Sequence, residues 1–236
     1  MQHYGGMAVS QGRGSYHRRH HRTSYHHGDL ANALADAATE MARTGGPNAI
    51  VLRAAARAAG VSAAAAYRHF ADHDELLQEV RRRALDSLAA AMRQSLDEVE
   101  PLADPAEESL RRLRALGRAY IRFALEDPGL FRTAFCRPDK PVPDAAGRMA
   151  THGPYALLSG VLDELVEHGV LDPDRRAGAE IPAWASVHGL ATLLIDGPLA
   201  LVTPEERARA VERSSDFMLN GIRGHRDRDP AADPAP

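Results

Sequence analysis

The sequence has few cysteines, few aromatic residues and no long apolar run, and each scarcity excludes a class of protein. A single cysteine, Cys136, among 236 residues excludes an internal disulfide framework and favours a reducing compartment, so we expect a cytosolic protein. No stretch reaches the roughly 18 uninterrupted apolar residues of a membrane span. The N-terminus is polar rather than a signal peptide. We therefore expect no membrane partner.

Strand patterns are also missing. Aromatic residues make up 5% of the sequence, and Val, Ile, Thr and aromatics show no sustained alternation of the kind that half-buried strands require. Alanine and leucine dominate the apolar positions, and both lose little on entering a helix. With 44% hydrophobic residues, the chain can bury a sizeable core. We predict an all-α protein made of a small module and a larger body.

Signatures of catalysis are absent as well. The sequence contains no H-E-x-x-H, G-x-S-x-G, P-loop or dinucleotide-binding pattern. His152, His168 and His188 are too far apart to suggest a metal site, and Cys136 has no recognisable base partner. We expect no enzymatic activity, no cofactor and no metal, with a helical enzyme behind a DNA-binding front as the alternative.

Charge is distributed unevenly along the chain. The formal net charge is −3, but residues 1–70 hold eight arginines against three acidic residues, so their net charge is +5 and that of the remainder is −8. A basic front and an acidic body are typical of a protein that presents one end to a polyanion. An architectural DNA-binding protein is a second candidate, although such proteins usually carry positive charge throughout.

Residues 1–24 are predicted to be a disordered basic and His-rich arm, since they offer almost nothing to bury. The arm could enter the DNA minor groove, bind a metal through its histidines, or be a solvated tail without a role of its own. The charged, proline-rich residues 225–236 are also predicted to be disordered.

The stretch Val51 to Phe70, VLRAAARAAGVSAAAAYRHF, predicts two short helices joined at Gly60. Gly60 can adopt the left-handed conformation that ends a helix. Val61 is expected to supply a buried staple, and Ser62 can cap the next helix with its hydroxyl. This is a helix-turn-helix, whose second helix can lie in the DNA major groove.

Helical periodicity and capping signals predict the other helices. Asp72 with Glu75 and Thr203 with Glu206 form capping boxes. The expected helices cover 29–44, 72–100, 104–127, 155–169, 181–195 and 203–222, with a short segment at 129–136 and a proline-rich loop at 137–143.

This arrangement resembles the TetR family of transcriptional regulators. The resemblance is carried by YHHGDL at 25–30, the Gly-Gly-Pro stop at 45–47 and VSAAAAYRHFADHDELL at 61–77. WASVHG at 184–189 is similar to the Trp-His-Gly pattern of one class of TetR-family C-terminal domains, the WHG domain. The resemblance implies a helix-turn-helix DNA-binding domain at 25–71 and a helical effector-binding and dimerisation domain at 72–224.

The resemblance further implies a homodimer that binds double-stranded DNA at a near-palindromic operator. Helices 181–195 and 203–222 are expected to pair with their symmetry mates, and the residues agree because the first is too apolar to face water. The alternative is that both are interior core helices. Repression, relieved by a small and largely apolar effector, is the family default, and the sequence identifies neither effector nor operator.

Carried over position by position, the DNA-facing residues of the family fall on both short helices. Arg53 is the expected base reader, because a guanidinium can bond guanine bidentately; the alternative is a surface Arg paired with phosphate or an acid. Ala63 to Ala66 stand where larger polar residues often read bases, so hydrogen-bonded readout there should be thin. Val51 stands where a Ser or Thr cap is usual, and Phe70 is assigned to the core. The predicted DNA-binding residues are Arg53, Ser62, Ala63, Ala64, Ala65, Tyr67, Arg68, His69 and His73, the last in place of a usual Lys.

An effector cavity in the body is also implied. Trp184 and His188 are four residues apart and share a helix face. His188 or Tyr155 could anchor a ligand in an apolar pocket; the alternative is that Trp184 and His188 pack the body and His188 hydrogen-bonds a buried carbonyl. The predicted ligand-binding residues are Tyr120, Phe123, Phe131, Phe135, Tyr155, Trp184 and His188.

Overall fold

A computed structural model describes residues 27–137 and 153–223 of the chain, and these form helices with no strand. The all-α prediction is therefore confirmed. The predicted arm, nearly all of the proline-rich loop and the C-terminal tail lie outside the described residues. The helices are α1 (His27–Gly45), α2 (Leu52–Ala58), α3 (Ala63–Ala66), α4 (His73–Asp97), α5 (Pro105–Glu126), α6 (Pro128–Phe135), α8 (Gly153–Glu167), α9 (Glu180–Ile195) and α10 (Pro204–Arg223).

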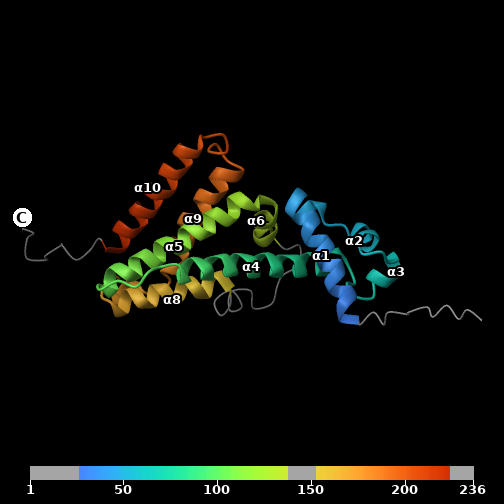
Figure 1. The fold of residues 1–236 in the computed structure, drawn as a ribbon, viewed down its shortest axis with the longest axis horizontal. Coiled ribbons are helices and arrows are strands. Elements are labelled where there is room, and N and C mark those ends of the chain that lie inside the picture. Colours follow the sequence, from blue (N-terminus) through green and yellow to red (C-terminus); the bar gives the residue numbers. More distant parts are fainter. Residues whose placement is uncertain (1–26, 138–152, 224–236) are drawn as a thin grey trace, which may run out of the picture.

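Helices α1 to α3 form a small module at one end of the molecule, and α4 runs from it along the larger body (Figure 1). In the body α4 packs against α5, α6 and α8, while α9 and α10 lie against α5. One core cluster extends from Leu34 and Ile50 in the module to Leu165 in the body. No described helix is long and apolar enough to cross a membrane.

The predicted capping signals set the helix starts. Asp72 accepts a hydrogen bond from the Glu75 amide at 2.9 Å, which satisfies one of the free N–H groups in the first turn of α4. Thr203 and Glu206 bond each other's amides at 3.2 and 3.0 Å, a complete capping box. The short segment at 129–136, for which no type was predicted, is helix α6.

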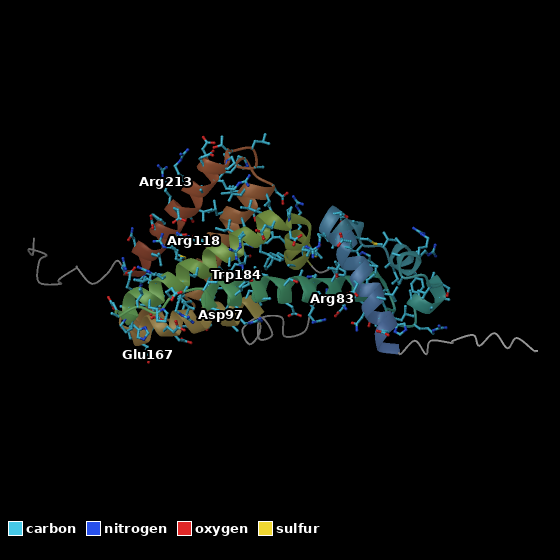
Figure 2. The ribbon with its side chains drawn as sticks, viewed as in Figure 1. Arg83, Asp97, Arg118, Glu167, Trp184 and Arg213 are labelled. Atoms are coloured by element: carbon cyan, nitrogen blue, oxygen red, sulfur yellow. The ribbon has the colours of Figure 1, made fainter. Side chains whose placement is uncertain are left out.

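Two ion pairs also join the module to the body. Arg83 of α4 reaches α1, where it pairs with Asp36 and bonds the Asn32 side chain at 2.9 Å (Figure 2). At the other end of α1, Arg43 pairs with Asp127, which directly precedes α6. The amino end of α6 thus meets the carboxyl end of α1, where the partial charges of two helix dipoles are opposite.

Candidate DNA-binding and effector sites

The helix-turn-helix forms as the sequence predicts. Gly60 has a φ of 71°, and the Val61 amide bonds the Ala56 carbonyl at 2.9 Å, the closing bond of a Schellman motif. Ser62 accepts a hydrogen bond from the Ala65 amide at 3.2 Å and so caps α3. Val51 supplies no side-chain cap to α2. Val61 is half-buried rather than buried as expected, although it packs against the core cluster.

The predicted DNA-facing residues lie on the outside of the module, and the surface that they form is called the reading face below. Ala66 and Phe70 are buried and hold α3 and the turn after it in the core. Tyr67 follows α3 and is 46% exposed. The remaining predicted residues are exposed or half-buried: Arg53, Ser62, Ala64, Arg68 and His73 are exposed, and Ala63, Ala65 and His69 are half-buried.

Arg53 projects from α2 without an acidic partner among the described residues. The alternative that Arg53 pairs with an acid is therefore not observed in the described part of the chain. Arg57 is likewise exposed and lies one turn further along α2. Its spacing of four from Arg53 places both arginines on one helix face.

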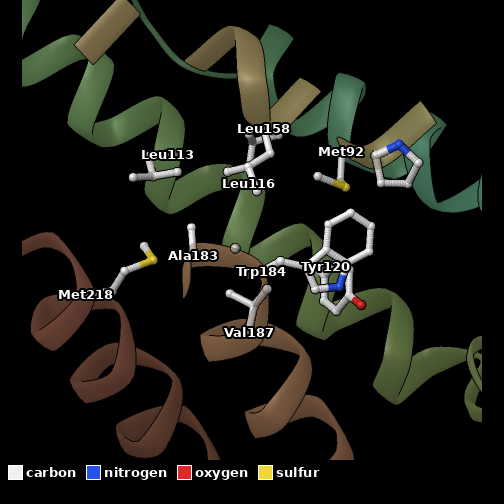
Figure 3. A pocket seen from close by; sticks show the side chains of 11 residues that line it. Met92, Leu113, Leu116, Tyr120, Leu158, Ala183, Trp184, Val187 and Met218 are labelled. Carbon is white, nitrogen blue, oxygen red and sulfur yellow. The ribbon is translucent and has the colours of Figure 1, made fainter. Parts of the chain in front are cut away.

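A narrow cavity of about 30 Å³ lies in the body between α5, α8 and α9 (Figure 3). It has room for only one or two water molecules. Of the predicted ligand-binding residues, Tyr120 and Trp184 line it. The other lining residues are mostly aliphatic and were not predicted: Met92, Leu113, Leu116, Gly117, Pro154, Leu158, Ala183, Val187 and Met218. The signal for them in the sequence was the apolar stripes of the predicted helices, which contain Met92, Leu113, Leu116, Leu158 and Met218.

An aromatic cluster adjoins this cavity, with Tyr120 at its centre. The ring of Tyr120 lies 5.6 Å from that of Phe131 in an edge contact and 5.9 Å from that of Trp184, between centroids. Phe135 contacts both Tyr120 and Trp184, and Tyr155 lies against Trp184. Phe123 is buried and makes no ring contact with a described residue, so its packing is core packing rather than part of this cluster.

The polar centre of the cluster is a hydrogen bond between the Tyr120 hydroxyl and Nδ1 of His188, 2.8 Å long. Nδ1 of His188 thus bonds a hydroxyl rather than the buried carbonyl of the alternative, while the ring packs on Phe131 and Phe135. Burial raises the pKa of Tyr120 and lowers that of His188, so both groups are neutral near pH 7. A neutral pair of this kind can reorient toward a ligand hydroxyl or carbonyl.

A helix-turn-helix with an exposed face, joined by one long helix to a helical body with an apolar cavity, defines a class of DNA-binding regulators with a helical C-terminal domain. Two family models match the chain: "Bacterial regulatory proteins, tetR family" over residues 34–80 and "Tetracyclin repressor-like, C-terminal domain" over residues 113–218. The chain belongs to the TetR family of transcription regulators. The second match includes the Trp184 to Gly189 pattern.

Solved structures agree with this assignment. A protein of unknown function from Rhodococcus sp. RHA1 is 28% identical, with a TM-score of 0.69 over 85% of this chain and 98% of that chain. The TetR family transcriptional regulator PfmR from Thermus thermophilus is 25% identical, with a TM-score of 0.52 over 81% and 97%. RolR, solved with resorcinol bound, shares the fold at 22% identity and a TM-score of 0.56 over 89% and 96%. No curated protein matches the chain.

Proposed function

We propose that the protein is a homodimeric, ligand-responsive repressor that leaves a near-palindromic operator when a small, largely apolar effector binds. The observation that carries this proposal is that the module with the reading face and the body with the cavity share one core, with α4 running through both. A change at the cavity can therefore alter the position of the reading face.

Exposed apolar residues on α9 and α10 support the homodimer. Ile181 is 61% exposed and Phe217 is 84% exposed, although both lie on ordered helices. Arg114 and Arg118 of α5 hold one side of α10 through Glu212, which leaves the Phe217 side facing outward. Apolar surface of this kind is typical of an interface, and a second copy offers the same face.

The interface is tested with Phe217→Asp. The variant should be a monomer by analytical ultracentrifugation at a concentration where the natural protein is a dimer, because a buried unpaired carboxylate is costly. Arg93→Asp, which changes an exposed residue of α4, should leave the dimer intact. A dimeric Phe217→Asp protein would contradict this assignment of the interface.

The effector is proposed to be a compact aromatic or aliphatic molecule with one or two polar groups. The cavity as it stands is too small for such a molecule, so side chains must move to admit it. Met92 and Met218 are suited to this, since methionine is flexible. The resorcinol bound by RolR is of the same chemical class. The effector would act only through its preference for the conformation that fits DNA poorly.

Selection of bound duplexes from a random pool, repeated with monocyclic phenols such as resorcinol, tests the function. We expect an enriched near-palindrome whose binding is weakened by a phenol. Ala183→Leu, which fills the cavity, should keep operator binding and lose the phenol response, whereas Ala90→Leu on the exposed side of α4 should keep both. Salt-dependent binding without an enriched sequence would favour an architectural protein instead.

A further inference from the structure

The hydrogen bond between Tyr120 and His188 has a direction, which follows from the burial of the hydroxyl. Tyr120 is 2% exposed, so its hydroxyl proton requires an acceptor inside the protein. Nδ1 of His188, 2.8 Å away, is the acceptor that the described residues provide. The hydroxyl therefore donates this bond, and Nδ1 accepts it through its lone pair.

Trp184 supports the same direction. Its ring lies 5.9 Å from that of Tyr120 between centroids, and its indole nitrogen lies beside the Tyr120 hydroxyl (Figure 3). Burial raises the pKa of Tyr120, and a hydrogen bond from the Trp184 side chain lowers it in part. An indole N–H can only donate, so the hydroxyl oxygen accepts there and the hydroxyl proton remains for His188.

The direction of the bond decides which nitrogen of His188 carries a proton. The imidazole is neutral near pH 7, because burial lowers its pKa, and a neutral imidazole has a single N–H group. Since Nδ1 is the acceptor, this proton lies on Nε2. No described residue accepts a hydrogen bond from Nε2. His188 therefore has a hydrogen-bond donor that its described neighbours do not use.

This donor lies next to the apolar cavity. Tyr120, to which His188 is bonded, and Val187, which precedes it in the chain, both line the cavity. Phe131 and Phe135 hold the imidazole ring, with centroids 5.4 and 4.9 Å from its own. None of the described residues that line the cavity is charged, so a charged ligand would be desolvated there without a counterion. The surroundings suit a neutral aromatic ligand that offers a hydrogen-bond acceptor.

We infer that Nε2 of His188 donates the hydrogen bond that recognises the effector, and that Tyr120 is a positioning residue that holds His188 in the required tautomer. The ligand class is then a neutral monocyclic aromatic molecule with a carbonyl, ether or hydroxyl oxygen as acceptor. A molecule of similar shape without an acceptor should bind more weakly, because it leaves the donor unpaired. The inference rests on the proposed function, since it names the chemistry that the proposed effector site selects.

The first measurement needs no ligand. The imidazole nitrogen resonances of the ¹⁵N-labelled full chain are recorded by NMR at about pH 8, where histidines are neutral. Those of His188 are identified by their loss in His188→Leu. We expect the proton on Nε2 and a hydrogen-bonded Nδ1. Tyr120→Phe removes the donor to Nδ1, so the His188 resonances should shift.

Tyr155→Phe is the matched control, because it removes a neighbouring hydroxyl that is not bonded to His188. This variant should leave the His188 resonances unchanged. A proton on Nδ1 in the natural protein would overturn the inference, and so would His188 resonances that Tyr120→Phe does not move.

The second measurement compares acetophenone with isopropylbenzene, which have similar shapes although only acetophenone has a carbonyl oxygen. Acetophenone should release the natural protein from the selected operator at an about 3- to 10-fold lower concentration, the ratio that one net hydrogen bond supplies. His188→Leu should lose this preference. Release at equal concentrations would leave the proposed function intact and overturn the inference. Release by neither compound would overturn the ligand class together with the proposed effector, and the nitrogen spectra distinguish that result from a wrong tautomer.

Discussion

At Gly129, α6 approaches α1 too closely to admit a side chain. A Cβ at this position would lie 2.3 Å from the carbonyl oxygens of both Ala42 and Arg43, whereas ordinary contacts begin near 3.4 Å. Gly129→Ala must therefore push the two helices about 1 Å apart. Overpacking of this kind costs about 1–3 kcal/mol. Alanine regains up to about 1 kcal/mol in a helix, so the free energy of unfolding should show a net fall of about 1 kcal/mol and at most about 2–3 kcal/mol.

The measurement is urea unfolding followed by circular dichroism at one fixed protein concentration, since the proposed dimer would make stability concentration-dependent. Gly160→Ala is the matched control: Gly160 lies within α8, and an added Cβ there would meet no atom within 4 Å. This variant should be more stable by about 0.5–1 kcal/mol. A Gly129→Ala protein as stable as the natural one, or a gain of equal size in both variants, would refute the close packing.

Three further predictions concern single side chains. Arg53→Ala should weaken operator binding by about 1–3 kcal/mol and reduce the base preference at one position of the operator. Equal weakening on operator and on random DNA would show that Arg53 contacts only phosphate. Ser62→Ala should lower the free energy of unfolding by about 1 kcal/mol through loss of the α3 cap, and Ser62→Asn should restore most of it; no difference between the two would contradict the role of the cap. Burial lowers the pKa of His188 in the folded protein. Below about pH 6.5 the unfolded chain therefore binds a proton at this position that the folded chain does not. The free energy of unfolding consequently decreases as the pH is lowered. His188→Gln should lose less stability than the natural protein between about pH 7.5 and 5.5 in urea unfolding; parallel curves would exclude this contribution.

The helix-turn-helix could be predicted from the sequence because the signals that define it are local. Gly60 ends α2 and Ser62 begins α3 through bonds to residues within five positions in the chain. The same holds for Asp72 at α4 and Thr203 at α10. Caps and turns are set by backbone geometry over a few residues, and tertiary packing has little opportunity to override them.

The cavity could be predicted only in part, because its lining is assembled from distant segments. Met92 on α4 and Met218 on α10 meet the same space although 126 positions separate them. Periodicity identifies the apolar face of each helix but does not say where two such faces leave a gap. Gly129 illustrates the same limit. The sequence assigns no structure to the short segment that begins at Gly129, and the need for a glycine there becomes visible only when the end of α1 is placed beside it.

Helix α6 connects the cavity region to the reading module. Its Phe131 and Phe135 pack on the Tyr120 and His188 pair, and Arg132 binds Asp196 beyond the end of α9. An effector that separates Trp184 from Tyr120 would displace these rings, and close packing would pass the shift along an eight-residue helix rather than absorb it. The shift would reach the carbonyl groups at the end of α1, where not even a methyl group fits. Since α1, α2 and α3 pack on one another in one core, the module would turn as a unit and the geometry of α2 and α3 would survive. The reading face would therefore change its position on DNA without unfolding.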